Sequence, residues 1–106
     1  MSQPEPQLQL HLAPQAKAST VALLYQIFGE VLIPIEQIRT RYFRNLNSEN
    51  FKSVIGTERL PIPVTTLDDS RKAMRYVEIH HLAAHIEQCS QQAVEDLGKR
   101  LNKQDE

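Results

Sequence analysis

Apolar residues recur at helical spacing in two short stretches in the middle of the chain. In the first stretch, Ile35, Ile38 and Phe43 fall close to one face, and polar residues occupy the others. Pro34 precedes this stretch, and its fixed φ suits a helix start because no amide partner is needed there. The pattern predicts a short extended entry at 32–34, followed by a short amphipathic helix.

The second stretch predicts another short helix, in which Phe51, Val54 and Ile55 form one apolar stripe. Asn47 or Ser48 is placed to cap its start, because a short polar side chain can accept hydrogen bonds from free backbone amides. Its outward positions are occupied by Glu49, Asn50, Lys52 and Ser53.

The residues on either side of the second helix favour turns. Residues 44–47 interrupt the helical pattern, and asparagine tolerates the left-handed conformation that a tight turn between helices can require. We expect the apolar side chain of Leu46 to pack beneath this turn. We expect Gly56 to end the second helix as its C-cap. Two helices joined in this way make a candidate helix-turn-helix.

Beyond the second helix the sequence favours extended structure. Pro61 and Pro63 forbid a helix over 60–66 and permit an edge strand or an extended segment. Residues 68–70, with the sequence Asp-Asp-Ser, favour a turn, and the β-branched and aromatic residues of 75–79 predict a return strand. Two strands joined by a basic loop after a second helix are what a winged helix-turn-helix requires.

Two further helices are predicted outside this unit. The first begins after a cap at Ser19 or Thr20, stops at Gly29 and is apolar around most of its circumference, so we expect it to be buried against the C-terminal helix. The second covers about 79–101 and would be roughly 35 Å long, which exceeds the needs of a small core. Ile86, Cys89 and Ala93 follow the alternating spacing of three and four by which helices pair, so we expect the excess length to form a homodimer contact. The alternative is that its last turns are solvated.

These elements predict a mainly α fold with a small β-wing. The fold class is a winged helix-turn-helix with an extra N-terminal helix and a long C-terminal helix. The 106 residues have room for one such domain. We place it at 19–103, after a flexible Gln/Pro-rich arm at 1–18 and before a tail at 104–106. Alternating leucines within the arm could add a strand to a sheet.

Positive charge is concentrated in the predicted helix-turn-helix and wing, although the whole chain has a formal net charge of -1. Between residues 39 and 75, eight arginines and lysines face four carboxylates, which gives +4 here and -5 for the rest. This charge distribution argues against a protein that coats DNA nonspecifically, because such proteins carry a large positive excess. It favours one local surface that recognises double-stranded DNA. The plainer alternative is an ordinary solvated surface that carries arginines.

The side chains of this segment predict how it would contact double-stranded DNA. Asn50 suits adenine and Lys52 suits guanine acceptors in the major groove, with Ser53 as a candidate third reader. The arginines before them would clamp phosphates, and the basic loop would reach the neighbouring backbone or the minor groove. With about six phosphate contacts, log affinity would fall with log salt at a slope of about -5. The candidate residues are Arg39, Arg41, Arg44, Ser48, Asn50, Lys52, Ser53, Ser70, Arg71, Lys72 and Arg75.

The sequence gives little support to other kinds of site. His81 and His85 share a helix face at metal-ligand spacing, but no third ligand is evident, and Cys89 lies on an apolar stripe. We therefore predict no enzyme activity, no metal and no cofactor. The single cysteine forms no internal disulfide, no secretion signal is recognisable, and no apolar run reaches the length of a membrane span. The expected location is the cytoplasm.

Short motifs along the chain resemble those of the pyocin activator family. The most specific are Leu-Pro-x-Pro-Val at 60–64 and Ser-x-Lys at 70–72, and the likeness covers roughly 20–92. The others are Ile33-Pro34, Tyr42-Phe43, Leu46-Asn47, Phe51 and Leu82-Ala83. The resemblance implies a small bacterial protein that binds promoter DNA and switches on bacteriocin or phage-derived operons.

Two alternative functions remain open from the sequence. The layout is also similar to excisionase and MerR-type winged helices, which bend DNA to direct a recombinase or RNA polymerase. The other alternative is a protein-interaction module, such as an antirepressor, that uses the long helix rather than the wing. The expected partners are double-stranded DNA and a second copy of the chain, with RNA polymerase or a recombinase as a further partner and no membrane.

Overall fold

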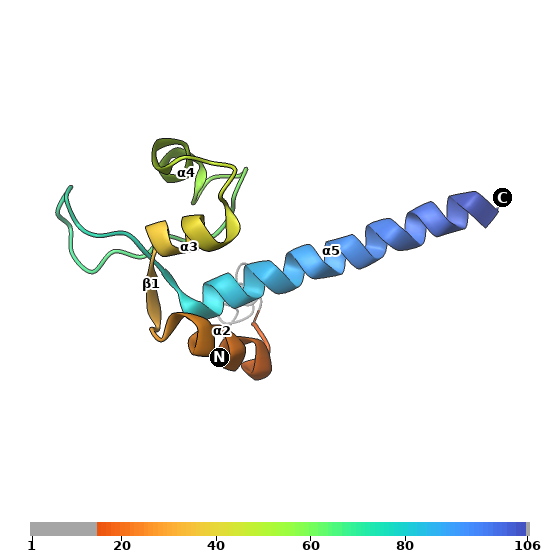
Figure 1. Ribbon diagram of the computed structural model, residues 1–106, viewed down its shortest axis with the longest axis horizontal. Helices are drawn as coiled ribbons and strands as arrows, with labels where there is room; N and C mark the ends of the chain where they lie inside the picture. The colour runs from red at the N-terminus through yellow and green to blue at the C-terminus, as the bar shows by residue number, and fades with distance from the viewer. Residues whose placement is uncertain (1–14, 106) are drawn as a thin grey trace, which may run out of the picture.

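The computed structural model describes residues 15–105, which form four helices and one two-stranded antiparallel sheet (Figure 1). The elements are α2 (Ala18–Phe28), β1 (Leu32–Pro34), α3 (Ile35–Tyr42), α4 (Ser48–Val54), β2 (Tyr76–Glu78) and α5 (Ile79–Asp105). The predicted mainly α architecture with a small β element is confirmed. Most of the predicted arm, with its alternating leucines, lies outside the described residues.

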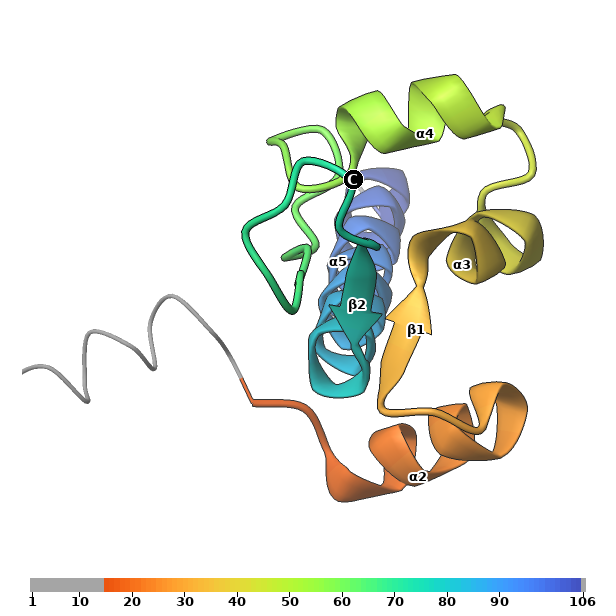
Figure 2. The same cartoon turned by 90° about the vertical axis from the view of Figure 1, so that its left-hand side faces the viewer.

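The small sheet joins the segment before α3 to the segment before α5 (Figure 2). Ile33 of β1 lies opposite Val77 of β2, and both side chains are fully buried. The predicted return strand is confirmed. Of the two alternatives for 60–66, an edge strand or an extended segment, the structure has the extended segment. Within it only Thr65 pairs with the return strand, through backbone hydrogen bonds of 2.7 and 2.9 Å to Tyr76. The prolines of this segment lack the N–H groups that a longer ladder requires.

The two middle helices begin where the sequence predicts. Pro34 is the N-cap of α3, and Asn47 is the N-cap of α4, where its side-chain oxygen accepts the Asn50 N–H at 2.8 Å. Leu46 packs against the core from the turn between them, as expected. The expectation of a left-handed asparagine in this turn is wrong, because no non-glycine residue of the described chain has a positive φ.

Two predicted helix caps differ in the structure. α2 has Lys17 as its N-cap and no side-chain capping hydrogen bond, so neither of the two hydroxyl residues predicted for that role caps it. Its predicted stop at Gly29 is confirmed, with a left-handed φ of 73°. The C-cap of α4 is Ile55 rather than Gly56. Gly56 follows with a φ of 85° and starts the next turn by donating its N–H to a carbonyl farther along the chain.

α2 packs against α5, as predicted, but it does so through one face only and is less buried than expected. Leu24 is its buried residue, and Val21 and Phe28 pack beside it. Leu23 and Ile27 are 61% and 45% exposed. Apolar composition alone did not determine burial here, because no other described element covers the far side of the helix.

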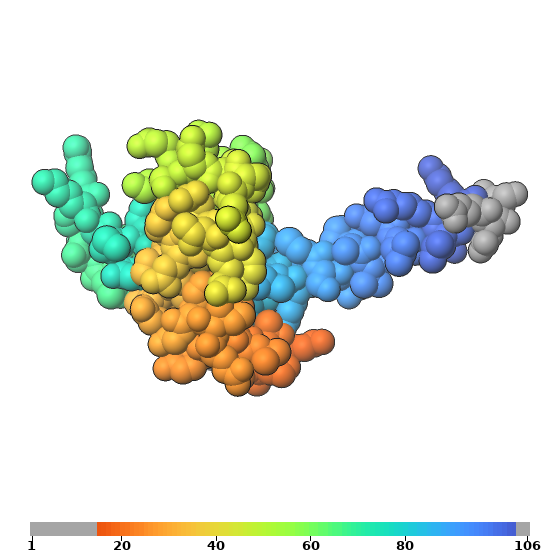
Figure 3. Space-filling view, viewed as in Figure 1, coloured from red at the N-terminus to blue at the C-terminus, as the bar shows by residue number. Residues whose placement is uncertain are grey.

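α5 is anchored at its start and projects beyond the rest of the molecule (Figures 1 and 3). Its 27 residues give a length of about 40 Å. Ile79, Leu82 and Ala83 are buried at its beginning, whereas Val94 and Leu97 on its projecting part are 62% and 53% exposed. No helix of the described chain is both long and apolar enough to cross a bilayer.

The core lies where α3, α4, the sheet and the start of α5 meet. Ile38, Phe51 and Ile62 are fully buried there, and the Phe51 ring lies 5.2 Å from the Phe43 ring between centroids. No polar or charged side chain is buried within residues 15–103. All the candidate DNA-contacting residues therefore lie at the surface, fully or partly exposed, on a small apolar framework.

Candidate nucleic-acid interface

A groove separates α4 from the loop formed by residues 66–75. The space-filling view shows this loop projecting beside α3 and α4, with a hollow between them (Figure 3). The groove encloses about 560 Å³, and Pro34, Ile35 and Met74 contribute apolar surface to its lining. Five of the predicted DNA-contacting residues also line it: Ser48, Lys52, Arg71, Lys72 and Arg75.

α4 presents the predicted polar residues to solvent. Asn50, Lys52 and Ser53 are exposed, as is Glu49 on the same face. The Ser53 hydroxyl donates to the Asn50 carbonyl at 2.8 Å, so it is already engaged within the helix. Within the described part of the chain, no hydrogen bond engages the side chains of Asn50 and Lys52. These two side chains are free to contact a ligand.

The tip of the 66–75 loop is folded by its own polar groups. The Ser70 N–H donates to the Asp68 carboxylate at 2.7 Å, and the Lys72 N–H donates to the Ser70 hydroxyl at 3.0 Å. A further bond of 3.1 Å joins the Ala73 N–H to the Ser70 carbonyl. Ser70 thus stabilises the turn. Arg71 and Lys72 remain exposed at the tip.

Arg75 connects this loop to α4. Its Nη1 donates to the backbone carbonyl of Lys52 at 3.3 Å, across 23 residues of sequence. Arg75 is partly exposed and Lys52 is exposed, and both line the groove. The contact places the cations of the loop beside the polar face of α4, so both belong to one surface.

Arg39 is engaged within the protein rather than free at the surface. Its Nε and Nη2 lie 2.8 and 2.6 Å from one oxygen of Glu36, and its Nη1 donates to the Leu46 carbonyl at 2.9 Å. The Ser48 hydroxyl lies 3.0 and 3.1 Å from the two Glu36 oxygens. This Glu36 cluster (Glu36, Arg39 and Ser48) joins α3, the turn and α4, and it includes two residues that were predicted to contact DNA, Arg39 and Ser48.

The electrostatics of the Glu36 cluster follow from these contacts. The hydrogen bond from Arg39 holds the pKa of Glu36 below its ordinary value, with a smaller contribution from Ser48. The same bond raises the pKa of Arg39. The sequence carried a signal for the Glu36–Arg39 pair, because residues three apart on a helix are neighbours. It carried none for Ser48, which is twelve positions from Glu36.

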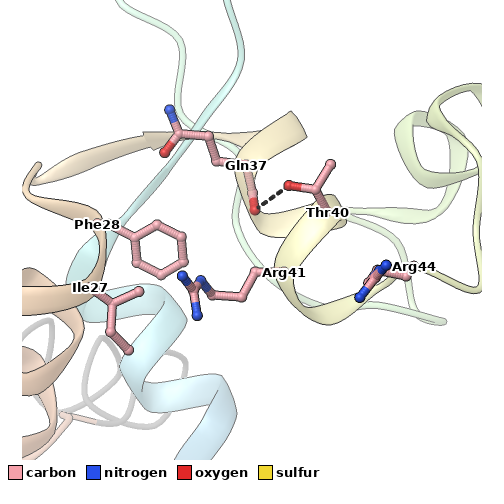
Figure 4. A pocket seen from close by; sticks show the side chains of 6 residues that line it. All are labelled: Ile27, Phe28, Gln37, Thr40, Arg41 and Arg44. Atoms are coloured by element: carbon pink, nitrogen blue, oxygen red, sulfur yellow. Dashed lines mark hydrogen bonds between the residues drawn. The ribbon is translucent and has the colours of Figure 1, made fainter.

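Arg41 and Arg44 lie at a second hollow, which shares no lining residue with the groove beside α4 (Figure 4). This hollow is formed by the end of α2 and the outer side of α3. The Arg41 guanidinium lies over the Phe28 ring at 5.7 Å from its centroid. The structure therefore separates these two arginines from the five candidate residues at the groove.

Among the histidines and the cysteine of α5, only His85 and Cys89 contact each other within the described residues. Cys89 Sγ lies 3.4 Å from Nε2 of His85, whose pKa is lowered by burial. His81 is partly buried, and its Nδ1 has no hydrogen-bond partner. Within the described residues, no group of three or more His, Cys, Asp or Glu side chains is placed to hold a metal ion.

Comparison with known proteins gives one match. A model of the family described as Pyocin activator protein PrtN matches residues 20–93, which include most of α2, the sheet, α3, α4, the 66–75 loop and the first half of α5. No curated protein and no solved structure shows significant similarity to the chain. The match covers well over half of the sequence.

Proposed function

The chain belongs to the pyocin activator family, and on that premise we propose that it activates transcription by binding promoter DNA as a winged helix-turn-helix. The family is one of regulatory proteins rather than enzymes and points to a transcriptional activator of pyocin genes. In this proposal α3 and α4 are the helix-turn-helix, and the 66–75 loop, closed by the Thr65–Tyr76 pairing, is the wing.

The observation that supports DNA binding best is the common groove of α4 and the wing. The Arg75 hydrogen bond joins the wing to α4. The groove between them is therefore lined by Lys52 from α4 and by the exposed pair Arg71 and Lys72 from the wing. In winged proteins the second helix enters the major groove while the wing contacts the neighbouring backbone or minor groove. Apolar surface at Met74 suits contact with deoxyribose.

The contacts fall into three groups. Asn50 and Lys52, which are free and exposed, are proposed to read base edges, with Ser53 as a weaker reader because its hydroxyl is already engaged. Arg71, Lys72 and Arg75 are proposed to contact phosphates. Arg39 and Ser48 act through Glu36, and Ser70 through the wing turn, to hold these groups in place. This last group positions the interface rather than touching DNA.

The homodimer is proposed to form through the projecting half of α5. Val94, Leu97 and Leu101 are 62%, 53% and 50% exposed and recur at spacings of three and four residues. That spacing generates the narrow apolar seam by which helices pair. Pairing would cover these side chains and present two reading units to one duplex, which raises both affinity and specificity.

A salt titration of the dissociation constant tests DNA binding. Purified protein is titrated into a labelled promoter fragment and into a scrambled duplex at several salt concentrations, and binding is followed by fluorescence anisotropy. Three phosphate contacts per protomer, from the three wing cations, give a slope of log affinity against log salt of about -2.7 for each bound protomer. Tighter binding of the promoter fragment than of the scrambled duplex, with a salt slope close to this value, supports the proposal. A flat salt response contradicts it.

A further inference from the structure

The hollow between α2 and α3 lies apart from the proposed DNA-binding groove, and we propose that it docks an acidic protein segment with an apolar anchor, carried by RNA polymerase. This inference rests on the proposed function, because it assumes a protein that activates transcription while bound to DNA. It assigns a separate surface to activation.

The hollow combines apolar and cationic surface. Ile27 and Phe28 come from the last turn of α2, and Arg41 and Arg44 come from the end of α3 and the turn after it (Figure 4). Its volume is about 410 Å³. Ile27 is 45% exposed, and the Phe28 ring supports the Arg41 guanidinium at 5.7 Å. An arginine held in this way needs less ordering when a ligand arrives.

The two arginines of the hollow lack the partner that Arg39 has. Arg39 is paired with Glu36 at 2.6 Å. Within the described part of the chain, neither Arg41 nor Arg44 makes an ion pair or a side-chain hydrogen bond. Two unpaired guanidinium groups favour carboxylates, which they can bind through two parallel hydrogen bonds. The charge of the site therefore selects an acidic ligand.

The apolar side chains of the hollow favour a protein ligand over a DNA backbone. A phosphate contact requires cations, amides or hydroxyls and gains nothing from an exposed isoleucine. An acidic segment with a leucine or phenylalanine would cover Ile27 while its carboxylates pair with Arg41 and Arg44. Gln37 and Thr40 complete the lining from α3, and neither belongs to the groove beside α4. Both surfaces can thus be occupied together.

The test separates DNA binding from activation in variants of the full chain. The variants are Arg41→Ala/Arg44→Ala and Ile27→Ala, and the matched control is Arg59→Ala, which removes an exposed arginine outside both hollows. Affinity and salt slope are measured on the promoter fragment by anisotropy. Transcription from the same fragment is measured with purified RNA polymerase holoenzyme at a protein concentration that saturates the DNA.

We expect the double arginine variant to bind DNA within about twofold of the wild type and to lose at least about tenfold in activated transcription. Ile27→Ala should reduce activation without changing the salt slope, and Arg59→Ala should change neither property. Weaker DNA binding, with a salt slope reduced by about 1 per arginine, would show that these residues clamp phosphates and would overturn the inference. Unchanged activation in both variants would overturn it too, while leaving DNA binding intact as the proposed function requires.

Discussion

The Ser48 hydroxyl lies within hydrogen-bond distance of both Glu36 carboxylate oxygens, at 3.0 and 3.1 Å, and so joins the first turn of α4 to the first turn of α3. Glu36 also pairs with Arg39, which in turn binds the carbonyl of Leu46 in the intervening turn. One carboxylate therefore organises both helices and the turn. Glu36, Arg39 and Ser48 thus fix how α4 is presented, although the sequence pattern places all three at polar positions.

Replacing this carboxylate is expected to loosen the connection between the helices. Glu36→Gln should lower the midpoint of urea denaturation without changing its slope, because Arg39 loses its ionic partner and Ser48 keeps only one of its two acceptor oxygens. Combined with Ser48→Ala, the losses should be less than additive, since both changes break one contact. Glu58→Gln is the matched control, because it removes the same charge from an exposed residue outside the cluster. Equal midpoints for Glu36→Gln and this control would mean that solvent screens the cluster.

The stability of the protein should fall in acid through two identified carboxylates. The pKa of Glu36 is lowered by Arg39, and that of Glu87 is lowered by the Thr20 side chain and the Lys17 backbone N–H. The unfolded chain then binds more protons than the folded chain between the folded pKa and the ordinary glutamate value. The contribution is complete above the ordinary value and is lost as pH falls through the folded pKa.

Urea denaturation between neutral pH and about pH 3 measures this dependence. The Glu36→Gln/Glu87→Gln protein should lose less stability over the acidic part of the range than the wild type does. Glu58→Gln should follow the wild type. A double variant with an unchanged pH profile would assign the acid sensitivity to other carboxylates.

Local chemistry explains which parts of the fold could be predicted. Pro34 sets the start of α3 through its own ring, Asn47 caps α4 through its own side chain, and Gly29 ends α2 through its left-handed φ. Each signal acts within a few residues. The family resemblance, confirmed over 20–93, rests on short motifs of the same kind.

The errors concern relationships between distant residues. β2 pairs mainly with β1, more than forty positions earlier, and no local signal distinguishes that partner from the nearer 60–66 segment. The burial of α2 was overestimated because apolar composition does not reveal how many neighbours a helix has. The spacing of Glu36 and Arg39 indicated their pairing, but no local signal placed Arg41 at the hollow away from the groove beside α4.

Substitutions in α4 and in the wing should affect DNA binding in different ways. Asn50→Ala should reduce discrimination at one base pair by about 1–3 kcal/mol, because an asparagine reads adenine through paired hydrogen bonds. Lys72→Ala should weaken all sequences alike and reduce the salt slope by about 1. Lys99→Ala on the projecting part of α5 is the control for loss of a cation. Competition binding with duplexes that differ at single positions makes the comparison. A uniform loss for Asn50→Ala and a changed preference for Lys72→Ala would reverse the assigned roles.

The projecting half of α5 is expected to determine the oligomeric state. Leu97 is 53% exposed on a part of the helix that touches no other described element, so a charge placed there should leave the folded domain intact. In a paired helix the same charge would be buried without a partner, which is strongly unfavourable. Leu97→Glu should therefore convert a dimer into a folded monomer and should weaken binding to a two-site promoter by at least about a hundredfold through lost avidity.

Gln88→Glu adds the same charge at an exposed position away from the Val94–Leu97–Leu101 seam and should remain dimeric. Sedimentation velocity and anisotropy on the three proteins separate the two outcomes. A monomeric wild type that binds the promoter as tightly as its Leu97→Glu variant would show that the last turns of α5 are solvated in the active protein.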